Sequence, residues 1–517
     1  MSQQVGTCCV VLHSHLPWLA HAGTWPVGEE WLHQAWSSSY IPLADLLSRL
    51  ADEGRRDVLT LGVTPVLHAM LDDPYLLRAN HTWLGYWQTR AVELAASGRF
   101  PDVAAGEYRR ATHALSSFDK RWRHGGSPVL RDLSDSGVIE LLGGPATHPF
   151  QPLLVDRLFV DAQLGVGLDD QRLRLGTRPR GIWAPECGYR PGLESSYADA
   201  GIGHFLVDGP TLLGSARDDP LATGSGWRVG DTDVVAFGRD LEVTYRVWSP
   251  RSGYPGGPWY RDFHHFDHPT GIRPYRVTGK STADHDKLPY DAARAAVAVH
   301  ADALDFVDVV RRRLIEIAER RGRPGMVVVG YDTELFGHWW LEGPDWLETV
   351  LRLLPEAGVR LSTLAGAVEA GHVTGRVALR PGSWGSGKDW RVWDGAAVSD
   401  LVEQSQDVQH RLIDIVDKTT AARPGQRLAA LDQLAREAFL LTASDWAFMV
   451  TKDSAASYAR SRHEAHLARF DELANLLSSR RDDAADRVAA RWRSVDGPFG
   501  HLDARRLARR DGMIVAP

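Results

Sequence analysis

Seven short apolar runs, separated by stretches of helical periodicity, constrain the fold of this 517-residue chain more than any other feature. The runs are rich in Val, Ile and Leu and are continuous rather than alternating, which is typical of strands buried on both faces. They span residues 8–15, 57–65, 137–148, 180–186, 203–210, 325–334 and 358–364. Strands that alternate with helices favour a parallel sheet, and seven of them fit a closed barrel better than an open sheet. We therefore predict an α/β fold and favour a barrel, although the periodicity alone does not separate a barrel from an open sheet.

Three regions depart from this alternation. Residues 72–130 are helical, rich in Trp and Arg, and too long for a simple connection, so we expect a helical insertion there. Residues 238–290 are rich in Gly, Pro and aromatic residues, which favours a long functional loop over a disordered linker. Beyond about residue 395 one helical pattern follows another. We expect a barrel domain over residues 1–395 and an all-α C-terminal domain over residues 396–517.

Composition excludes several classes of partner. The formal net charge is −7, so no basic excess indicates binding to nucleic acid or to an anionic membrane. The first residues have no basic stretch followed by an apolar one, and no apolar run is long enough to cross a bilayer. The three cysteines, two of them adjacent, cannot form a useful disulfide framework, which favours a reduced, cytoplasmic protein. The sequence sets no oligomeric state.

Polar side chains gather just past the predicted strands, at the face where barrel enzymes carry their active sites. They are His13, His15, Thr64, His68, His148, Glu186, Asp208, Asp332 and Glu334. Glu186 follows Trp183 and Pro185, and Asp332 is followed by several aromatic residues. Burial among aromatic rings favours the neutral form of a carboxyl group, which a general acid needs near neutral pH. Paired carboxyl groups beside aromatic platforms indicate chemistry on glycosidic bonds. The 19 tryptophans, more than either Phe or Tyr, agree with sugar stacking.

Five segments, in order, resemble the signature regions of glycoside hydrolase family 57. They are HSHLP (13–17), ELLGGPATHPFQPLL (140–154), IWAPECGY (182–189), YDTELFGHWW (331–340) and SDWAF (444–448). The second segment departs from the family, because related branching enzymes tend to read TCAATHG, yet His148 is retained. Three more segments look most like the 1,4-alpha-glucan branching enzymes of this family, in their actinobacterial form: FGRD (237–240), VWSPRSGYPG (247–256) and RVTG (276–279).

The resemblance implies a distorted (β/α)7 TIM-like barrel with a helical C-terminal domain, and a retaining mechanism without a cofactor. Glu186 matches the family's nucleophile and Asp332 its acid/base. The resemblance also implies substrate contacts, to which we add two tryptophans of the fourth and fifth segments as expected sugar platforms. These residues are His15, His148, Arg261, Gly279, Trp384, Asp445, Trp339 and Trp446. The implied partner is an α-glucan whose chains are transferred to form α-1,6 branches.

Other functions stay open at this point. The same two acids would serve hydrolysis or linear 4-alpha-glucan transfer, so they cannot separate these activities from branching. A metal-dependent carbohydrate-active barrel is a further alternative, since His13 and His15 point the same way on a strand and the segment 264–268 reads HHFDH. No Cys₂His₂ or HExxH spacing supports it, and we expect no metal. A glucan-binding protein without turnover is disfavoured because both acids are retained.

Overall fold

The computed structural model describes residues 4–249 and 252–509. Its strands are β1 (Gly6–Ser14), β2 (Leu59–Val63), β3 (Ile139–Leu142), β4 (Gly181–Ile182), β5 (His204–Val207), β6 (Gly226–Val229), β7 (Val235–Gly238), β8 (Met326–Asp332), β9 (Val359–Leu361) and β10 (Val373–Val377). They form two sheets, with the orders β3-β2-β1-β8 and β10-β6-β7-β5-β4, and β9 pairs with β1. Except for the antiparallel pair β6–β7, all strand pairs are parallel.

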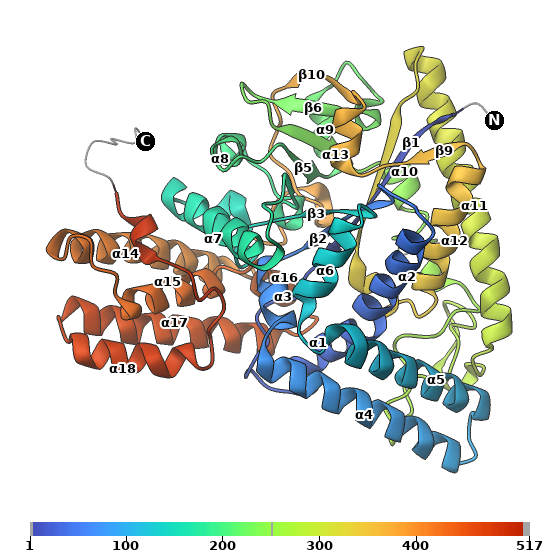
Figure 1. Ribbon diagram of the computed structural model, residues 1–517, viewed down its shortest axis with the longest axis horizontal. Helices are drawn as coiled ribbons and strands as arrows, with labels where there is room; N and C mark the ends of the chain where they lie inside the picture. The colour runs from blue at the N-terminus through green and yellow to red at the C-terminus, as the bar shows by residue number, and fades with distance from the viewer. Residues whose placement is uncertain (1–3, 250–251, 510–517) are drawn as a thin grey trace.

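The two sheets meet at two narrow junctions and enclose a distorted barrel. At one junction Gly143, just past β3, forms a bridge with Ile182 of β4. At the other, the amide of Asp240, just past β7, donates to the carbonyl of Val328 in β8 over 2.8 Å. The ring therefore runs β1-β2-β3-β4-β5-β7-β8, which gives the seven-stranded barrel that we predicted. The central strands occupy the middle of the molecule (Figure 1).

One member of the ring differs from the predicted set of strands. The ring uses β7, which the sequence analysis did not single out, and not the run at residues 358–364. That run does form a strand, β9, but β9 pairs only with the first residues of β1, from Gly6 to Cys8. It therefore extends the sheet at the end of β1 that lies away from the polar residues.

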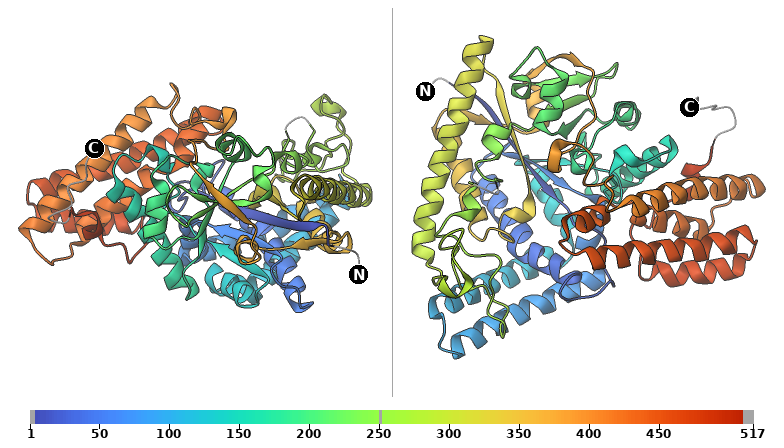
Figure 2. Two further views of the ribbon diagram at one scale, coloured as in Figure 1. Left: turned by 90° about the horizontal axis from the view of Figure 1, so that it is seen from above. Right: turned by 180° about the vertical axis from the view of Figure 1, so that it is seen from behind.

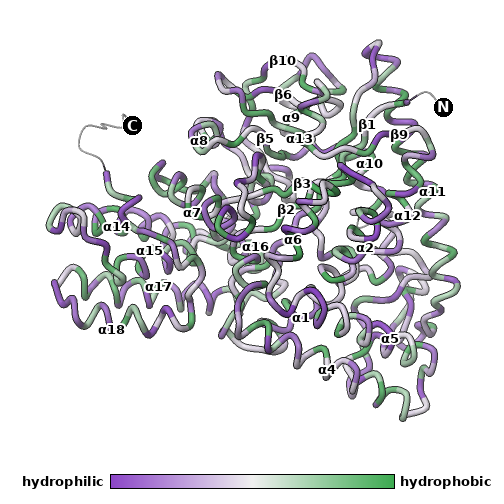
Figure 3. The backbone as a smooth tube through the Cα atoms, viewed as in Figure 1, coloured by the Kyte–Doolittle hydropathy of each residue, from purple (hydrophilic) through white to green (hydrophobic). Residues whose placement is uncertain are grey.

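Thirteen helices of the described residues surround the barrel or extend from it. They are α1 (Glu29–Ala35), α2 (Ile41–Asp52), α3 (Pro65–Leu71), α4 (Pro74–Ala96), α5 (Pro101–Ser117), α6 (Gly126–Asp135), α7 (Arg157–Leu175), α8 (Leu193–Asp199), α9 (Gly209–Ser215), α10 (Leu241–Thr244), α11 (Ala292–Arg321), α12 (Gly343–Glu356) and α13 (Leu364–Glu369). Helices α4 and α5 lie side by side at one edge of the molecule (Figures 1 and 2). The outer helices alternate between hydrophilic and hydrophobic residues along their length, as one-sided burial requires (Figure 3).

The long helix α11 shows how the sequence sets these boundaries. Asp291 caps its N-terminus by accepting from the amide of Arg294, and Gly322 ends it with φ of 67°. Carboxylate caps satisfy amides that lack a partner in the first turn, and glycine adopts the left-handed conformation at little cost. None of the helices in the described ranges is long and apolar enough to cross a membrane.

Residues beyond the barrel form a separate group of helices. These are α14 (Ser399–Ala422), α15 (Ala429–Leu441), α16 (Ser444–Lys452), α17 (Ala456–Ser478) and α18 (Asp482–Arg493). Four of them project to one side, whereas α16 turns back towards the barrel (Figures 1 and 2). The amide of Ser444, the first residue of α16, donates to the carbonyl of His148, which follows β3. This contact brings the C-terminal helices to the end of the barrel where the polar residues gather.

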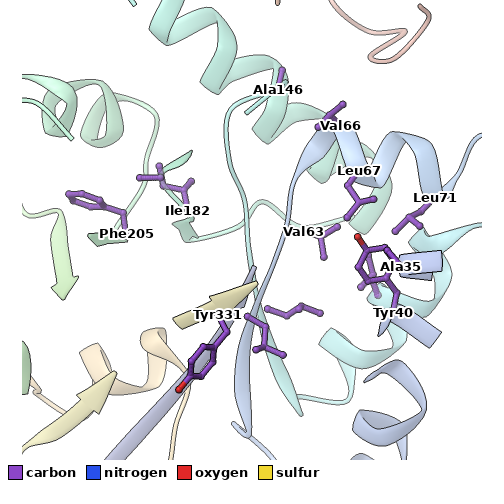
Figure 4. Close-up of a cluster of buried hydrophobic side chains, with 14 of the residues drawn as sticks. Ala35, Tyr40, Val63, Val66, Leu67, Leu71, Ala146, Ile182, Phe205 and Tyr331 are labelled. Carbon is purple, nitrogen blue, oxygen red and sulfur yellow. The ribbon is translucent and has the colours of Figure 1, made fainter. Parts of the chain in front are cut away.

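An apolar cluster beneath this end supports the site. Val63 at the end of β2 and Leu67 of α3 lie beside the ring of Tyr40 (Figure 4). The hydroxyl of Tyr40 lies at the edge of this cluster and donates a hydrogen bond to Glu334, just past β8. Side-chain packing thus fixes a polar group at the strand ends.

Candidate active site

Backbone strain marks the ends of two adjacent strands. Glu186 has φ of 60° and Cys187 has φ of 49°, in a short 3-10 turn just past β4. His148, past the neighbouring strand β3, has φ of 56°. Non-glycine residues rarely adopt these left-handed conformations, which cost on the order of 1–3 kcal/mol each and gather at functional sites.

Hydrogen-bond donors hold both carboxylate oxygens of Glu186. The indole Nε1 of Trp384 donates to Oε2 over 2.7 Å, and the hydroxyl of Ser444 donates to Oε1 over 2.8 Å. Burial raises the pKa of Glu186 to about 7, and the two hydrogen bonds oppose that rise. The donors fix the orientation of the carboxylate and favour its charged form, which is the form that a nucleophile needs.

Asp332 and the first histidine of the site lie side by side on neighbouring strands. Asp332 is the last residue of β8, and its register partner in β1 is His13. Burial raises the pKa of Asp332 to about 6, against the lowering effect of Arg239 and His15. Within residues 4–249 and 252–509 no hydrogen bond to the Asp332 side chain is found, so this carboxyl can take up or release a proton without breaking one.

Two of the three histidines of the site contact the start of α16, and the third contacts one of these two. The rings of His15 and His148 stack with centroids 3.7 Å apart, and Nε2 of His13 lies 3.1 Å from Nε2 of His148. Nε2 of His15 lies 3.0 Å from the carboxylate of Asp445, and its Nδ1 lies 3.0 Å from the hydroxyl of Thr64.

Only one of these histidines gains affinity for a proton. Burial lowers the pKa of His15, but the negative charge of Asp445, with smaller effects of Glu186 and Glu334, outweighs burial and leaves the pKa raised. Burial and the charge of His15 hold the pKa of His148 well below its usual value. The site therefore places a histidine of raised pKa against a neighbour of lowered pKa.

A buried arginine connects the ends of strands β5, β7 and β8. Arg239, just past β7, forms hydrogen bonds of 2.9 and 2.7 Å to Asp208 and one of 3.1 Å to the carbonyl of Gly330. Its guanidinium lies 5.0 Å from the ring centroid of Trp384. Arg239 thus links β5, β7 and β8 and backs the indole that binds Glu186.

A third buried carboxyl, Glu334, accompanies the pair. It accepts from the hydroxyl of Tyr40 and, over 3.1 Å, from the backbone amide of His15. Burial and the nearby Asp332 raise the pKa of Glu334 to about 8. The hydrogen bond from the His15 amide to Glu334 holds the end of β1 in place.

Three of the residues expected to bind substrate lie in or beside the 238–290 segment. Arg261 and Gly279 belong to the 238–290 segment, and within the described residues neither forms a hydrogen bond or ion pair with the residues around Glu186. Trp339 lies near Trp248 of that segment, with ring centroids 5.8 Å apart. Of the segment 247–256, Pro250 and Arg251 lie outside the described residues.

The expectation for Trp446 needs correction. Its side chain is only 1% exposed, and its indole N–H donates to the carbonyl of Leu440 over 2.9 Å. It packs with Leu401 and Met449 between the C-terminal helices. Trp446 therefore stabilises that packing and offers no open ring face to a sugar.

Sequence reasoning missed two residues of the site, Ser444 and Arg239. Ser444 directly precedes Asp445 in SDWAF, and Arg239 is the first charged residue after an apolar run in FGRD. Position alone could have marked Arg239, since it follows a strand as Glu186 does. Nothing local marks Ser444, whose contact with Glu186 spans 258 positions in the chain.

A metal centre competes with hydrogen bonds already present. His15, His148 and Asp445 bring ligand atoms within 4.8 Å of one another. The ring nitrogens of these two histidines, however, already face Thr64, Asp445, Ser444 and His13. The other histidine-rich segment is divided among ion pairs, with Asp267 bound to Arg99 and His265 beside Asp262. The ring nitrogens that a metal ion would need at His15 and His148 are thus already engaged in hydrogen bonds.

Residues 9–379 match the sequence profile of glycosyl hydrolase family 57, and residues 404–506 match the profile described as 1,4-alpha-glucan branching enzyme, C-terminal. The chain belongs to glycoside hydrolase family 57. This assignment confirms the resemblance drawn from the five segments, and it covers both the barrel and the C-terminal helices.

Similar proteins match this chain over nearly its whole length. A probable 1,4-alpha-glucan branching enzyme of Mycobacterium tuberculosis is 53% identical over 98% of both chains, as the resemblance to the actinobacterial form predicts. The crystal structure of a family 57 branching enzyme from Thermococcus kodakaraensis, in complex with glucose and additives, matches with a TM-score of 0.92 and 30% identity over 98% of this chain and 97% of that chain. The α-amylase AmyC of Thermotoga maritima matches with a TM-score of 0.87 and 27% identity over 98% and 99%.

Proposed function

We propose that this family 57 protein is a 1,4-alpha-glucan branching enzyme that works through a covalent glucosyl-enzyme, with Glu186 as nucleophile and Asp332 as acid/base. Its substrate is then an α-1,4-glucan, and its product carries α-1,6 branches. The observation that carries the assignment of roles is the contrast between the two acids. Glu186 is held by a donor on each oxygen, whereas Asp332 accepts no hydrogen bond from the described residues.

In the first step a carboxylate oxygen of Glu186 attacks the anomeric carbon of a glucosyl unit. The bond from that carbon to the glycosidic oxygen breaks, and Asp332 gives its proton to the departing oxygen. The result is an ester between Glu186 and the transferred chain. His15, whose pKa the charge of Asp445 raises, lowers the pKa of both acids when it is protonated.

In the second step Asp332 takes the proton of a 6-hydroxyl on an acceptor glucan. The hydroxyl oxygen attacks the anomeric carbon, the ester to Glu186 breaks, and an α-1,6 bond forms. Water must stay out for transfer to prevail over hydrolysis. The 238–290 segment, which Tyr254 and Tyr260 anchor to α11 through Asp305 and Asp302, is our candidate for excluding it on closing over a bound glucan.

A mechanism-based label tests the assignment of Glu186. A fluorinated glucosyl fluoride forms the covalent adduct but releases it slowly, so mass spectrometry should find the added mass on the peptide that contains Glu186. The variant Asp332→Asn should still be labelled, because fluoride departs without a proton, whereas Glu186→Gln should not. Labelling of another carboxylate in the wild-type protein would overturn the assignment.

Hydrolysis of α-glucan is the second candidate, because AmyC, which shares the fold at a TM-score of 0.87, is described as an α-amylase. The same pair of acids would serve it, and also linear 4-alpha-glucan transfer. Branching is the better supported function, since the match at residues 404–506 is to the C-terminal region of branching enzymes. The cytoplasmic location stays a prediction.

A further inference from the structure

A second cavity lies apart from Glu186 and Asp332. It is an open hollow between helices α4 and α5 and the segment 261–273, with Trp339 in its wall. Neither acid lines it, nor do His15, His148 or Trp384.

The walls of this cavity carry an excess of positive charge. The lining arginines are Arg90, Arg110, Arg261 and Arg273, and the lining carboxylates are Glu107 and Asp262. Glu107 already accepts from Arg110 over 2.9 Å and from Arg261, and Asp262 is bound by Lys287. Within residues 4–249 and 252–509, Arg90 and Arg273 have no carboxylate in an ion pair.

Aromatic rings pack against these two guanidinium groups, and Nε of Arg273 also donates to the carbonyl of Phe263 over 2.6 Å. Arg90 lies 5.0 Å from the ring centroid of Trp83, and Arg273 lies 4.4 Å from that of Phe263. Stacking on a ring leaves the N–H edge of a guanidinium free for an acceptor. Fixed donors of this kind bind an anion without first losing side-chain entropy.

Some donors of the cavity also lack partners inside the protein. Among the described residues, the Nε atoms of Arg90 and Arg261 are buried and have no hydrogen-bond partner. Arg261 as a whole is only 8% exposed. Buried donors nearly always have a hydrogen-bond partner, so two N–H groups without one favour the binding of an acceptor from outside the protein. Burial lowers the pKa of Arg273, and the charges of Arg261 and Arg110 lower it further, whereas Glu107 raises it.

We propose that this cavity binds a saccharide that carries one anionic group, either a phosphate monoester or a carboxylate. The forked edges of Arg90 and Arg273 match the two oxygens of such a group. The ring of Trp339 and the polar side chains of Gln34 and Ser38, all in the cavity wall, suit the neutral part of a sugar. The inference does not rest on branching, and two residues of the cavity wall, Arg261 and Trp339, are also among the glucan contacts expected from the sequence.

Calorimetry on the full chain tests the proposal with four probes: glucose 6-phosphate, glucuronate, glucose and inorganic phosphate. We expect one of the charged sugars to bind at least tenfold more tightly than glucose and than inorganic phosphate, and to weaken as salt is added. Tighter binding of glucose 6-phosphate would identify the phosphate ester, and tighter binding of glucuronate the carboxylate. Equal binding of glucose and both charged sugars, or of inorganic phosphate and both, would overturn the proposal.

Variants locate the binding in this cavity. Arg90→Gln and Arg273→Gln should each weaken the charged sugar at least tenfold and leave glucose unchanged. Arg90→Lys keeps the charge without the fork and should retain part of the affinity, which separates lost recognition from lost folding. Arg294→Gln is the matched control, because Arg294 stacks on Trp259 at 4.7 Å and does not line the cavity. Unchanged affinity in both glutamine variants would contradict the assignment.

Discussion

The hydroxyl of Ser444 donates a hydrogen bond of 2.8 Å to Oε1 of Glu186, although the first residue belongs to a C-terminal helix and the second to the barrel. The same hydroxyl oxygen lies 3.0 Å from Nδ1 of His148. Because Ser444 has one proton and gives it to Glu186, His148 must donate from Nδ1. Nε2 of His148 then accepts a hydrogen bond from Nε2 of His13. Nδ1 of His13 has no partner among the described residues, which agrees with this assignment. A chain of donors therefore points at Glu186.

Removing the end of this chain should raise the pKa of Glu186. Ser444→Ala loses a hydrogen bond to a charged acceptor, worth about 1.5–3 kcal/mol, so kcat/KM should fall about tenfold or more. Ser444→Thr keeps the hydroxyl and should recover most of the activity. A rate profile over pH separates this positioning role from a packing defect, because only the former moves a limb of the profile. An unmoved profile in Ser444→Ala would contradict the role.

The direction of that movement follows from the two pKa values. The productive form needs Glu186 ionised and Asp332 protonated, and their pKa values are about 7 and about 6. The profile of kcat/KM against pH should therefore be a narrow bell with limbs near pH 6 and pH 7. Raising the pKa of Glu186 by Ser444→Ala should move the alkaline limb to higher pH and lower the plateau. Activity that keeps rising above pH 9 would be incompatible with this pair.

Substitution of Asp332 should depend on the leaving group. Asp332→Asn cannot protonate a glucosyl leaving oxygen, so action on a glucan should fall by orders of magnitude. An activated aryl glucoside needs little protonation and should be cleaved at a rate closer to that of the wild type. Glu186→Gln should lose both substrates, because no covalent intermediate can form. Equal losses on the two substrates in Asp332→Asn would argue against an acid at this position.

The buried ion pair of Arg239 and Asp208 should matter for stability as well as for the site. Arg239→Gln leaves the buried Asp208 carboxylate with Lys388, 2.7 Å away, as its remaining charged partner, so the cost should lie at the lower end of about 3–5 kcal/mol. Arg246→Gln is the control, since Arg246 pairs with Asp305 in a half-exposed position, where such pairs contribute about 0–1 kcal/mol. Urea unfolding curves of the two variants give the comparison. A loss in Arg239→Gln no larger than in the control would show that the pair is dispensable.

How far the sequence predicts this site depends on how local each signal is. Glu186 and Asp332 follow buried strands directly, so the pattern of apolar runs places them at the barrel end. Trp384 could be expected only from the family resemblance, since its bond to Glu186 spans 198 positions. Ser444 was not predicted, because only the return of α16 to the barrel brings it near.

The sequence pattern led to a wrong expectation for Trp446 and did not reveal strand β7. The sequence marks Trp446 as an aromatic beside Asp445, but it cannot tell an open ring from one packed among helices. Strand β7 has only four residues, Val235–Gly238, and runs straight into the Gly/Pro-rich segment, so its apolar pattern is short. Tertiary pairing with β5, not local preference, makes it a member of the ring.

The most direct test of the account is the action of the protein on linear amylose. The iodine stain, the reducing ends, and the chain lengths after debranching should be followed together. Transfer conserves the number of glycosidic bonds, so the account predicts a weaker stain, little rise in reducing ends, and short chains released only by the debranching enzyme. A rise in reducing ends that matches the loss of stain, or redistributed chain lengths with nothing for the debranching enzyme to cut, would contradict branching.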